Sequence, residues 1–294
     1  MNIIYCGDKG IERGVLVSVL SLIRNGRKRF DLKKGKMVFD EKIKEPEYHI
    51  FILTIRYKEV KPFSRRVAER LDELVKKENE RSFVKLIDAT EVFVKNLPKK
   101  NMGSYFTPAS MLRLYIDKVP EIAALERVLY LDYDVVCRGN IGEFYNTEME
   151  GIEAAGVLDI YGRIWYHYNG LLVQDYMNSG VMLFNMTECL KTRMFEKAAR
   201  LCATKKMMLA DQAALNKEIS RRKLMPRRFN EQEERPRVDT ILHHFSNNFK
   251  FWPYFRVQKV KPFEVDKIHE ILKIYEYDDI LEEYLKMQDD LGRG

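Results

Sequence analysis

The sequence predicts an α/β fold with a mostly parallel sheet flanked by helices. Three observations favour this fold. Apolar stretches of strand length alternate with amphipathic stretches of helix length from residue 3 to residue 131. A chain of 294 residues with 46% hydrophobic residues can bury one large core. No stretch rich in glycine or proline divides the chain, so we expect one main domain.

The first half of the chain has a β-α pattern. An apolar strand is followed by an amphipathic helix that ends at Asn25-Gly26, residues that commonly end helices. The same alternation continues up to residue 131, and it places the ends of parallel strands at one edge of the sheet. We expect strands at residues 3–6, 48–55, 83–87 and 128–131, and helices at residues 11–23, 63–78 and 108–116.

After Asn140 the apolar stretches become shorter and an aromatic segment, 161–176, separates two of them. This change predicts a mixed rather than a parallel sheet. The chain then ends in a long amphipathic stretch, which predicts a C-terminal helical extension. We expect strands at residues 151–158, 180–185 and 240–245, helices at residues 194–204 and 212–219, and helical structure at residues 265–285.

Composition excludes several classes. No run approaches the roughly 18 apolar residues of a membrane span, and the N-terminus lacks a signal-peptide pattern, so we expect a cytoplasmic protein. The net charge is +7, and basic residues cluster at 24–36 and 221–228. These clusters would suit a phosphorylated ligand, a nucleic acid or an anionic membrane surface, or they are merely solvated faces. The four cysteines, Cys6, Cys137, Cys189 and Cys202, show no metal-site spacing and are expected to be reduced packing residues.

Two aspartates after the strand at 128–131 indicate a metal site. Residues two apart in a strand point to the same face, so Asp132 and Asp134 would bring both carboxylates to one point. Such like charges are tolerated when a cation lies between them, and oxygen ligands suit Mg²⁺ or Mn²⁺. An imidazole from the distant His244 would favour Mn²⁺. Its neighbour His243 would point to the opposite face and be structural. A lone Asp-x-Asp more often only satisfies backbone groups.

Several further stretches of the sequence support a metal site at Asp132 and Asp134. YFTPASMLRL at 105–114 and ERVLYLDYDVV at 126–136 resemble the signature of the family 8 retaining glycosyltransferases, which include bacterial galactosyl- and glucosyltransferases and glycogenin. The resemblance implies a GT-A type, Rossmann-like mixed sheet over 1–262 and a C-terminal helical extension over 263–294. It continues through the opening strand with Asp8, Asn178-Ser179-Gly180-Val181, Asp211-Gln212 with Leu215-Asn216, Phe229-Asn230 and 244–252.

The resemblance also implies roles for individual residues. The metal, Mn²⁺ or else Mg²⁺, would be held by Asp132, Asp134 and His244 against the diphosphate of a UDP-sugar. The remaining donor contacts would come from Asp8 on the uracil, Arg113 near the phosphates, Lys250 as the phosphate clamp, and Asn178, Ser179 and Gly180 around the sugar.

For the reaction, the resemblance implies that Asp211 binds donor sugar hydroxyls and Gln212 lies beneath the anomeric carbon. An amide is a poor nucleophile, so we expect a front-face route with retention. Ala213 stands where the family often has a second aspartate, which makes double displacement less favourable. Asp159 would face the acceptor. The nearby aromatics would stack on acceptor sugar rings, form a core patch or belong to a mobile loop; they are Tyr161, Trp165, Tyr166, Tyr168 and Tyr176.

The predicted function is transfer of glucose or galactose from a UDP-sugar to a saccharide or glycolipid acceptor, with peripheral contact to the inner face of an anionic membrane and no nucleic acid partner. Two departures bear on donor affinity: Asn247 replaces the family's usual glycine and Phe251 its usual proline. Two alternatives stay open. One is a non-catalytic sugar-nucleotide-binding protein, and the other is a metal-dependent nucleotidyltransferase or phosphohydrolase.

Overall fold

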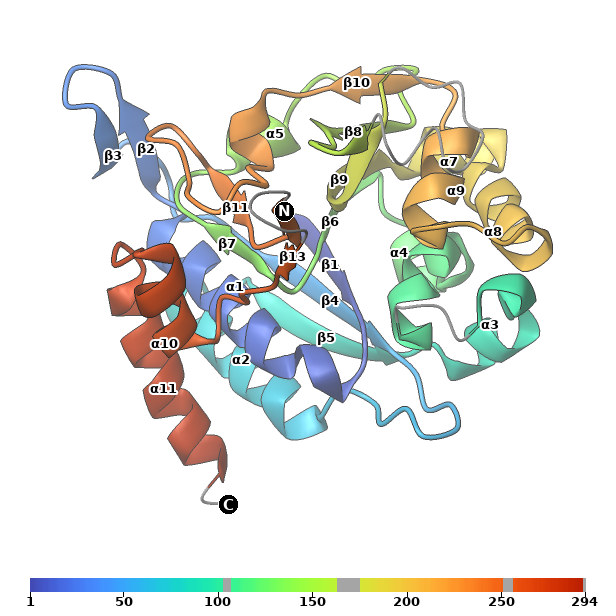
Figure 1. Ribbon diagram of the computed structural model, residues 1–294, viewed down its shortest axis with the longest axis horizontal. Coiled ribbons are helices and arrows are strands. Elements are labelled where there is room, and N and C mark those ends of the chain that lie inside the picture. Colours follow the sequence, from blue (N-terminus) through green and yellow to red (C-terminus); the bar gives the residue numbers. More distant parts are fainter. Residues whose placement is uncertain (103–106, 163–174, 251–255, 293–294) are drawn as a thin grey trace.

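A computed structural model describes residues 1–102, 107–162, 175–250 and 256–292. Its centre is a seven-stranded sheet in the order β10-β8-β9-β6-β1-β4-β5 (Figure 1). Strands β6, β1, β4 and β5 are parallel, whereas β9 runs antiparallel to both β6 and β8. The sheet is therefore mixed, as predicted. Its strands are β1 (Asn2–Cys6), β4 (His49–Thr54), β5 (Phe83–Asp88), β6 (Arg127–Leu131), β8 (Ala154–Leu158), β9 (Met177–Asn185) and β10 (Arg222–Leu224).

Alternate side chains of the strands enter two separate cores. Ile3 and Tyr5 of β1 pack with α1 (Glu12–Asn25) and α2 (Arg65–Glu78), while Ile4 and Cys6 pack with the helices on the other face. Those helices are the 3₁₀ helix η3 (Pro108–Lys118), α8 (Met194–Thr204) and α9 (Ala210–Glu218), with α3 (Thr90–Lys95), α4 (Pro120–Ala123) and α7 (Met186–Thr192) beside them (Figure 1). The four cysteines are free and buried, as expected.

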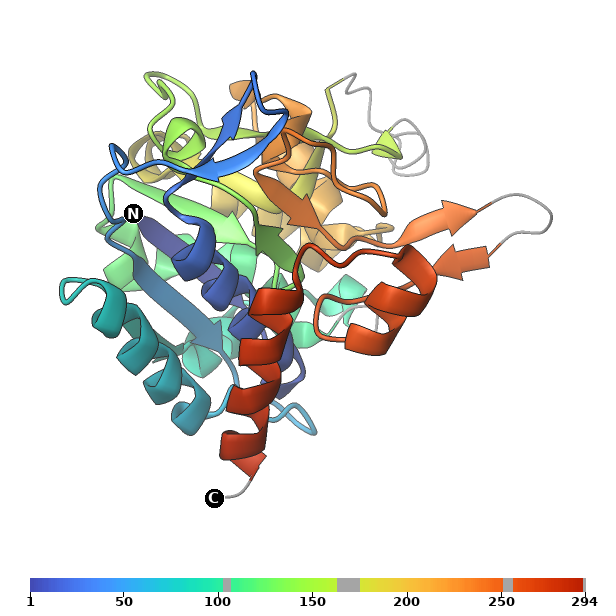
Figure 2. The ribbon, with the colours of Figure 1, turned by 90° about the vertical axis from the view of Figure 1, so that its left-hand side faces the viewer.

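Smaller elements surround this sheet. Strand β7 (Val135–Cys137) pairs with β11 (Leu242–His244), and α5 (Gly142–Tyr145) follows β7. Two hairpins were not foreseen from the sequence: β2 (Lys28–Asp31) with β3 (Lys36–Phe39), and β12 (Asn248–Lys250) with β13 (Arg256–Gln258). The β2–β3 hairpin projects from the body of the molecule in Figure 1, and strands β12 and β13 project from it in Figure 2. Each of these strands has only three or four residues, and none of their described side chains is fully buried, so little apolar periodicity is left to detect.

Two predicted helices differ from the observed ones. The segment expected as a helix at 108–116 is a 3₁₀ helix, buried along most of its length, so tertiary packing rather than local propensity selects its form. The C-terminal stretch is divided into α10 (Val265–Lys267), a single π-helical turn at 268–272, and α11 (Asp278–Gly292). Lys273 ends the first part in a left-handed conformation, with φ of 55°, without the glycine that would reveal such an end in sequence.

The C-terminal helix α11 packs against α1, so the last elements of the chain cover the same face of the sheet as α1 and α2 (Figures 1 and 2). Arg13 of α1 donates a hydrogen bond to the Tyr284 hydroxyl at 2.7 Å, and Arg24 pairs with Glu283 at 2.7 Å. Among the described helices, none has the length and apolar character needed to cross a membrane.

Candidate metal and donor site

Three potential metal ligands converge at the carboxyl end of β6. His244 Nε2 lies 3.4 Å from Asp134 Oδ1 and 3.8 Å from Asp132 Oδ2, and one ligand atom of each residue lies within 4.8 Å of the others. The reason given from sequence was wrong in detail, because the aspartates lie in the turn between β6 and β7 rather than in a strand. His244 reaches them because β11 pairs with β7, which places it opposite Val135.

In each aspartate, one carboxylate oxygen contacts a basic side chain of the protein, and the other oxygen faces His244. Asp132 Oδ1 accepts hydrogen bonds from Arg113 at 2.7 Å and from the Tyr130 hydroxyl at 2.6 Å, and Asp134 Oδ2 accepts one from Lys261 Nζ at 2.5 Å. Asp134 Oδ1 is buried and accepts no hydrogen bond from the described residues. A buried carboxylate oxygen without a donor is costly, which fits a site built for a cation.

A chain of side-chain hydrogen bonds fixes the orientation of the imidazole. Asp159 Oδ2 accepts from Asn178 Nδ2 at 2.9 Å, and Asn178 Oδ1 accepts from Asn230 Nδ2 at 2.9 Å. Asn230 Oδ1 is then left to accept from His244 Nδ1, at 3.2 Å. The proton therefore lies on Nδ1, and the lone pair of Nε2 faces the two aspartates, as a metal ligand requires. His243, by contrast, is buried and bonds Tyr277, in agreement with its predicted structural role.

Lys261 is the cation that keeps Asp134 ionised. Burial alone would raise the pKa of this carboxyl, but the adjacent Lys261 ammonium opposes burial, and the pKa lies well below its usual value. Asp134 is therefore ionised at neutral pH and can act as a ligand. Burial raises the pKa of Asp159, although Asn178 and Gln212 partly oppose the shift by donating hydrogen bonds to it.

Arg113 is a buried residue at the centre of the site. Its Nη1 donates to the Ser179 backbone oxygen at 3.0 Å and to Ser179 Oγ at 3.1 Å, and its Nε lies 3.1 Å from Asp211 Oδ2. With the contact to Asp132, the guanidinium links the β6 turn, β9 and α9, while its flat face covers the Tyr130 ring at 4.2 Å. The planar fork of five donors makes these contacts possible at once.

Gln212 lies in the same cluster, in the first turns of α9. Its Oε1 accepts from the Ser179 backbone N–H at 2.9 Å, and its Nε2 donates to Asp159 Oδ2 at 3.2 Å. Both Asp211 and Gln212 are buried, so Gln212 does not merely face solvent at the start of the helix. The amide is held rigidly between β9 and the residue that follows β8.

Gly180 provides room for the metal ligands. A Cβ atom at this position would lie 2.2 Å from His244 Cε1 and 2.9 Å from Asp132 Oδ2. Its φ angle is not in the left-handed region, so close approach rather than backbone conformation requires glycine here. The groups that approach Gly180 most closely are therefore two of the potential metal ligands.

A sequence model of glycosyl transferase family 8 matches residues 2–255. The chain belongs to glycosyltransferase family 8. A lipopolysaccharide 1,2-glucosyltransferase of Escherichia coli is 27% identical over 275 residues, which cover 85% of this chain and 73% of that protein. Another, from strain K12, is 33% identical over 85 residues, covering 28% of this chain and 25% of that protein.

Solved structures share the fold of this family 8 chain. The galactosyltransferase LgtC, in complex with donor and acceptor sugar analogues, has a TM-score of 0.66 at 16% identity and covers 97% of this chain and 96% of its own. The glycosyltransferase GlyE of Streptococcus pneumoniae TIGR4 has a TM-score of 0.58 at 15% identity, over 98% of this chain and 64% of its own. The predicted GT-A type fold is confirmed.

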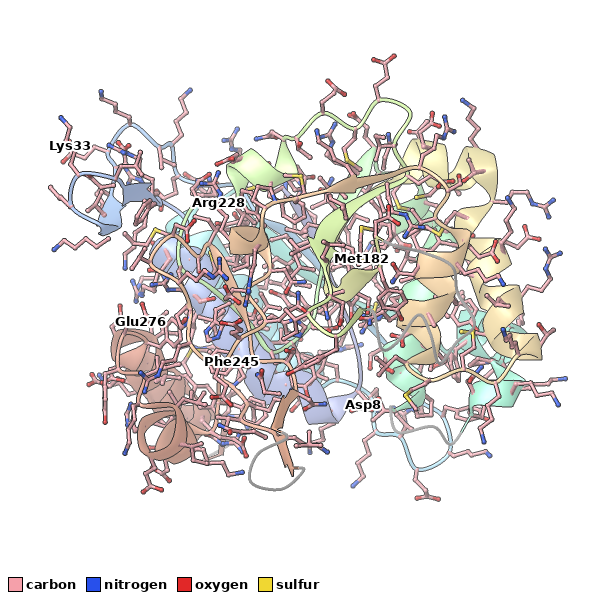
Figure 3. The ribbon with its side chains drawn as sticks, turned by 45° about the horizontal axis from the view of Figure 1, so that its top comes forward. Asp8, Lys33, Met182, Arg228, Phe245 and Glu276 are labelled. Atoms are coloured by element: carbon pink, nitrogen blue, oxygen red, sulfur yellow. The ribbon has the colours of Figure 1, made fainter. Side chains whose placement is uncertain are left out.

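Other predicted site residues lie at the same edge or outside the described part. Asp8, buried just after the end of β1, accepts a hydrogen bond from the Gly10 backbone N–H at 2.8 Å (Figure 3). Lys250 lies in β12, but its side chain is not among those described, so its role as phosphate clamp stays a prediction. The aromatics Trp165, Tyr166 and Tyr168 also lie outside the described residues.

Lys261 was missed by the sequence analysis. It lies beyond residues 2–255, which match family 8, yet it contacts a potential metal ligand of the site. One signal was present: Lys261 is followed by Pro262 and the aromatic Phe263, whereas Lys250 is followed by Phe251 in place of the usual proline. The β12–β13 hairpin separates the two lysines.

Proposed function

We propose that this family 8 enzyme transfers a hexose, glucose or galactose, from a UDP-sugar to a saccharide or glycolipid acceptor with retention of configuration. The observation that carries the proposal is the convergence of Asp132 Oδ2, Asp134 Oδ1 and His244 Nε2, with the cations Arg113 and Lys261 behind them. The name of the E. coli relative and the sugar analogues bound to LgtC support glucose or galactose as the transferred sugar.

The ligand set fits a divalent cation, and one imidazole with two carboxylates favours Mn²⁺ over Mg²⁺. Bound there, the cation would neutralise charge that develops on the diphosphate as the sugar–phosphate bond breaks. The protein's part is orientation. Arg113 holds Asp132, and Lys261 holds Asp134, so that one oxygen of each faces the imidazole.

In the proposed transfer, the acceptor hydroxyl attacks the anomeric carbon on the face from which the diphosphate leaves. The bond between that carbon and the phosphate oxygen breaks, and the released phosphate oxygen takes the hydroxyl proton. Gln212, held by Ser179 and Asp159, would place its amide dipole near the developing positive charge. Asp211 is paired with Arg113, and Ala213 offers no carboxylate, which favours this route over a covalent intermediate.

The test is a donor screen with product analysis. Purified protein with Mn²⁺ is incubated with UDP-glucose, UDP-galactose and control nucleotide sugars, and nucleotide products are separated by chromatography. We expect slow release of intact UDP from one UDP-hexose, abolished in Asp134→Asn. Release of UMP would instead indicate attack at phosphorus. Donor binding without UDP release, even with a panel of oligosaccharide acceptors, would indicate a non-catalytic binding protein.

The proposal includes peripheral contact with an anionic membrane, which only one of the two basic clusters supports. In the cluster at 221–228, the arginines at 221, 222, 227 and 228 are each paired with a carboxylate. Lys33, Lys34 and Lys36 of the β2–β3 hairpin are exposed and form no ion pair with a described residue (Figure 3). Recovery of all the protein in the supernatant after sedimentation with anionic vesicles would contradict this contact.

The division into a main domain at 1–262 and a helical extension at 263–294 also remains a proposal. Support comes from the change to helical elements after Phe263 and from the packing of α11 on α1. Limited proteolysis that releases the extension, while leaving a folded core, would support two units.

A further inference from the structure

Lys261 lies at the metal centre although it belongs to the C-terminal part of the chain. Its ammonium is 2.5 Å from Asp134 Oδ2 and 3.0 Å from the backbone oxygen of Phe245, the residue after His244. The side chain is 20% exposed, so it borders the site from the solvent side rather than being enclosed within the core.

The ammonium retains capacity for a further ligand. It carries three N–H donors, and among the described residues Asp134 and Phe245 accept two of them. A phosphate oxygen is a suitable third acceptor, because charge-assisted bonds of this kind are short and strong. The position next to a metal ligand is where a diphosphate bound to that metal would extend.

Charge at the site gives a second argument. The carboxylates that contact Arg113 or Lys261 are Asp132, Asp134 and Asp211, so three negative groups face two positive ones. A divalent cation would change the sum of these charges from −1 to +1. Without Lys261 the loaded site would be neutral and would attract a diphosphate less strongly.

Contacts made by its neighbours at 260–264 hold Lys261 in place. Its backbone N–H donates to Glu264 Oε2 at 2.8 Å, and Val260 before it is buried. Phe263 packs beside Tyr133, with ring centroids 6.5 Å apart, and the Arg13 guanidinium lies 4.8 Å from the centre of the Phe263 ring. The lysine is therefore positioned before any ligand binds.

We propose that Lys261 binds the diphosphate of the nucleotide donor directly, so that the segment following the β12–β13 hairpin completes the donor site. This inference rests on the proposed function, because it requires a metal-bound diphosphate. It assigns to Lys261 a donor contact that the resemblance placed on Lys250, and it makes residues beyond the family match part of the binding machinery.

The test measures UDP affinity by isothermal titration calorimetry with saturating Mn²⁺, using the full chain. Lys261→Met removes the charge and keeps a side chain of similar length, and we expect UDP affinity to fall about 10- to 100-fold. Lys261→Arg should recover most of the loss. Lys76→Met, which removes a lysine paired with Asp72 on α2 at 2.6 Å, serves as the matched control and should bind as the wild type does.

The outcomes separate this inference from the proposed function. If the wild type binds UDP with Mn²⁺ and Lys261→Met binds equally tightly, the assignment of Lys261 is overturned while the metal site stands. If the wild type binds no UDP, both are overturned. Lys250→Met is measured in parallel. Weaker UDP binding by Lys250→Met would not support the assignment of Lys261, which requires weaker UDP binding by Lys261→Met itself. Circular dichroism at the titration temperature confirms that each variant is folded.

Discussion

Replacing Gly180 by alanine should disrupt the metal site with little effect on the rest of the fold. The added Cβ would lie 2.2 Å from His244 Cε1 and 2.7 Å from His244 Nδ1. An ordinary carbon–carbon contact is about 3.5 Å, so the imidazole must move by about 1.3 Å. Metal ligands tolerate displacements of about 0.2 Å. We therefore expect Mn²⁺ affinity to fall at least about a hundredfold.

Mn²⁺ binding is measured from the electron paramagnetic resonance signal of free Mn²⁺ during titration. The overpacking should cost about 1–3 kcal/mol of stability, which urea unfolding measures separately. Gly156→Ala in β8 is the control, because its Cβ would first meet Met177 Sδ at 3.2 Å, a flexible side-chain atom. Wild-type Mn²⁺ affinity in a folded Gly180→Ala variant would refute the placement of His244 and Asp132 beside this glycine.

Three further predictions concern the surroundings of the site. Asn230→Ala removes the acceptor of the His244 Nδ1 proton, so Mn²⁺ affinity in the resonance titration should fall about 10- to 100-fold; an unchanged affinity would contradict the relay. Arg113→Lys should lower kcat/KM for the donor about a hundredfold, because one ammonium cannot replace several guanidinium hydrogen bonds. A decrease in kcat/KM of less than threefold would contradict this role of Arg113. Burial lowers the pKa of His243 from 6.5 to about 3. As the pH falls, the unfolded chain therefore takes up a proton at His243 before the folded chain does. Lowering the pH from 7 to 5 should reduce the free energy of unfolding by about 2 kcal/mol through this residue, and His243→Gln should lack this reduction. Urea unfolding of both proteins at both pH values measures the difference.

The convergence of Asp132 and Asp134 could be predicted from their spacing, although not the conformation that produces it. Period-two alternation applies to a strand, and the chain turns at Tyr133 instead. His244 is brought to the aspartates by the pairing of β11 with β7, a contact between distant segments that local patterns do not contain. The resemblance to family 8 supplied that link.

The hydrogen-bond relay and Lys261 could not be derived from sequence patterns. Asn178 and Asn230 are 52 residues apart, and only the folded chain shows that each amide orients the next. Lys261 follows a hairpin whose two strands have three residues each, too few for hydrophobic periodicity to give a signal, so its return to the site could not be placed. The strands of the parallel half, by contrast, are apolar enough to be located closely from sequence.

Anomalous diffraction at the manganese edge, from crystals grown with Mn²⁺ and UDP, would locate the metal directly. We expect one strong anomalous peak bonded to Asp132 Oδ2, Asp134 Oδ1 and His244 Nε2, with the diphosphate oxygens completing its coordination. A peak bonded to other residues, or bound UDP whose diphosphate lies away from these three side chains, would contradict this expectation.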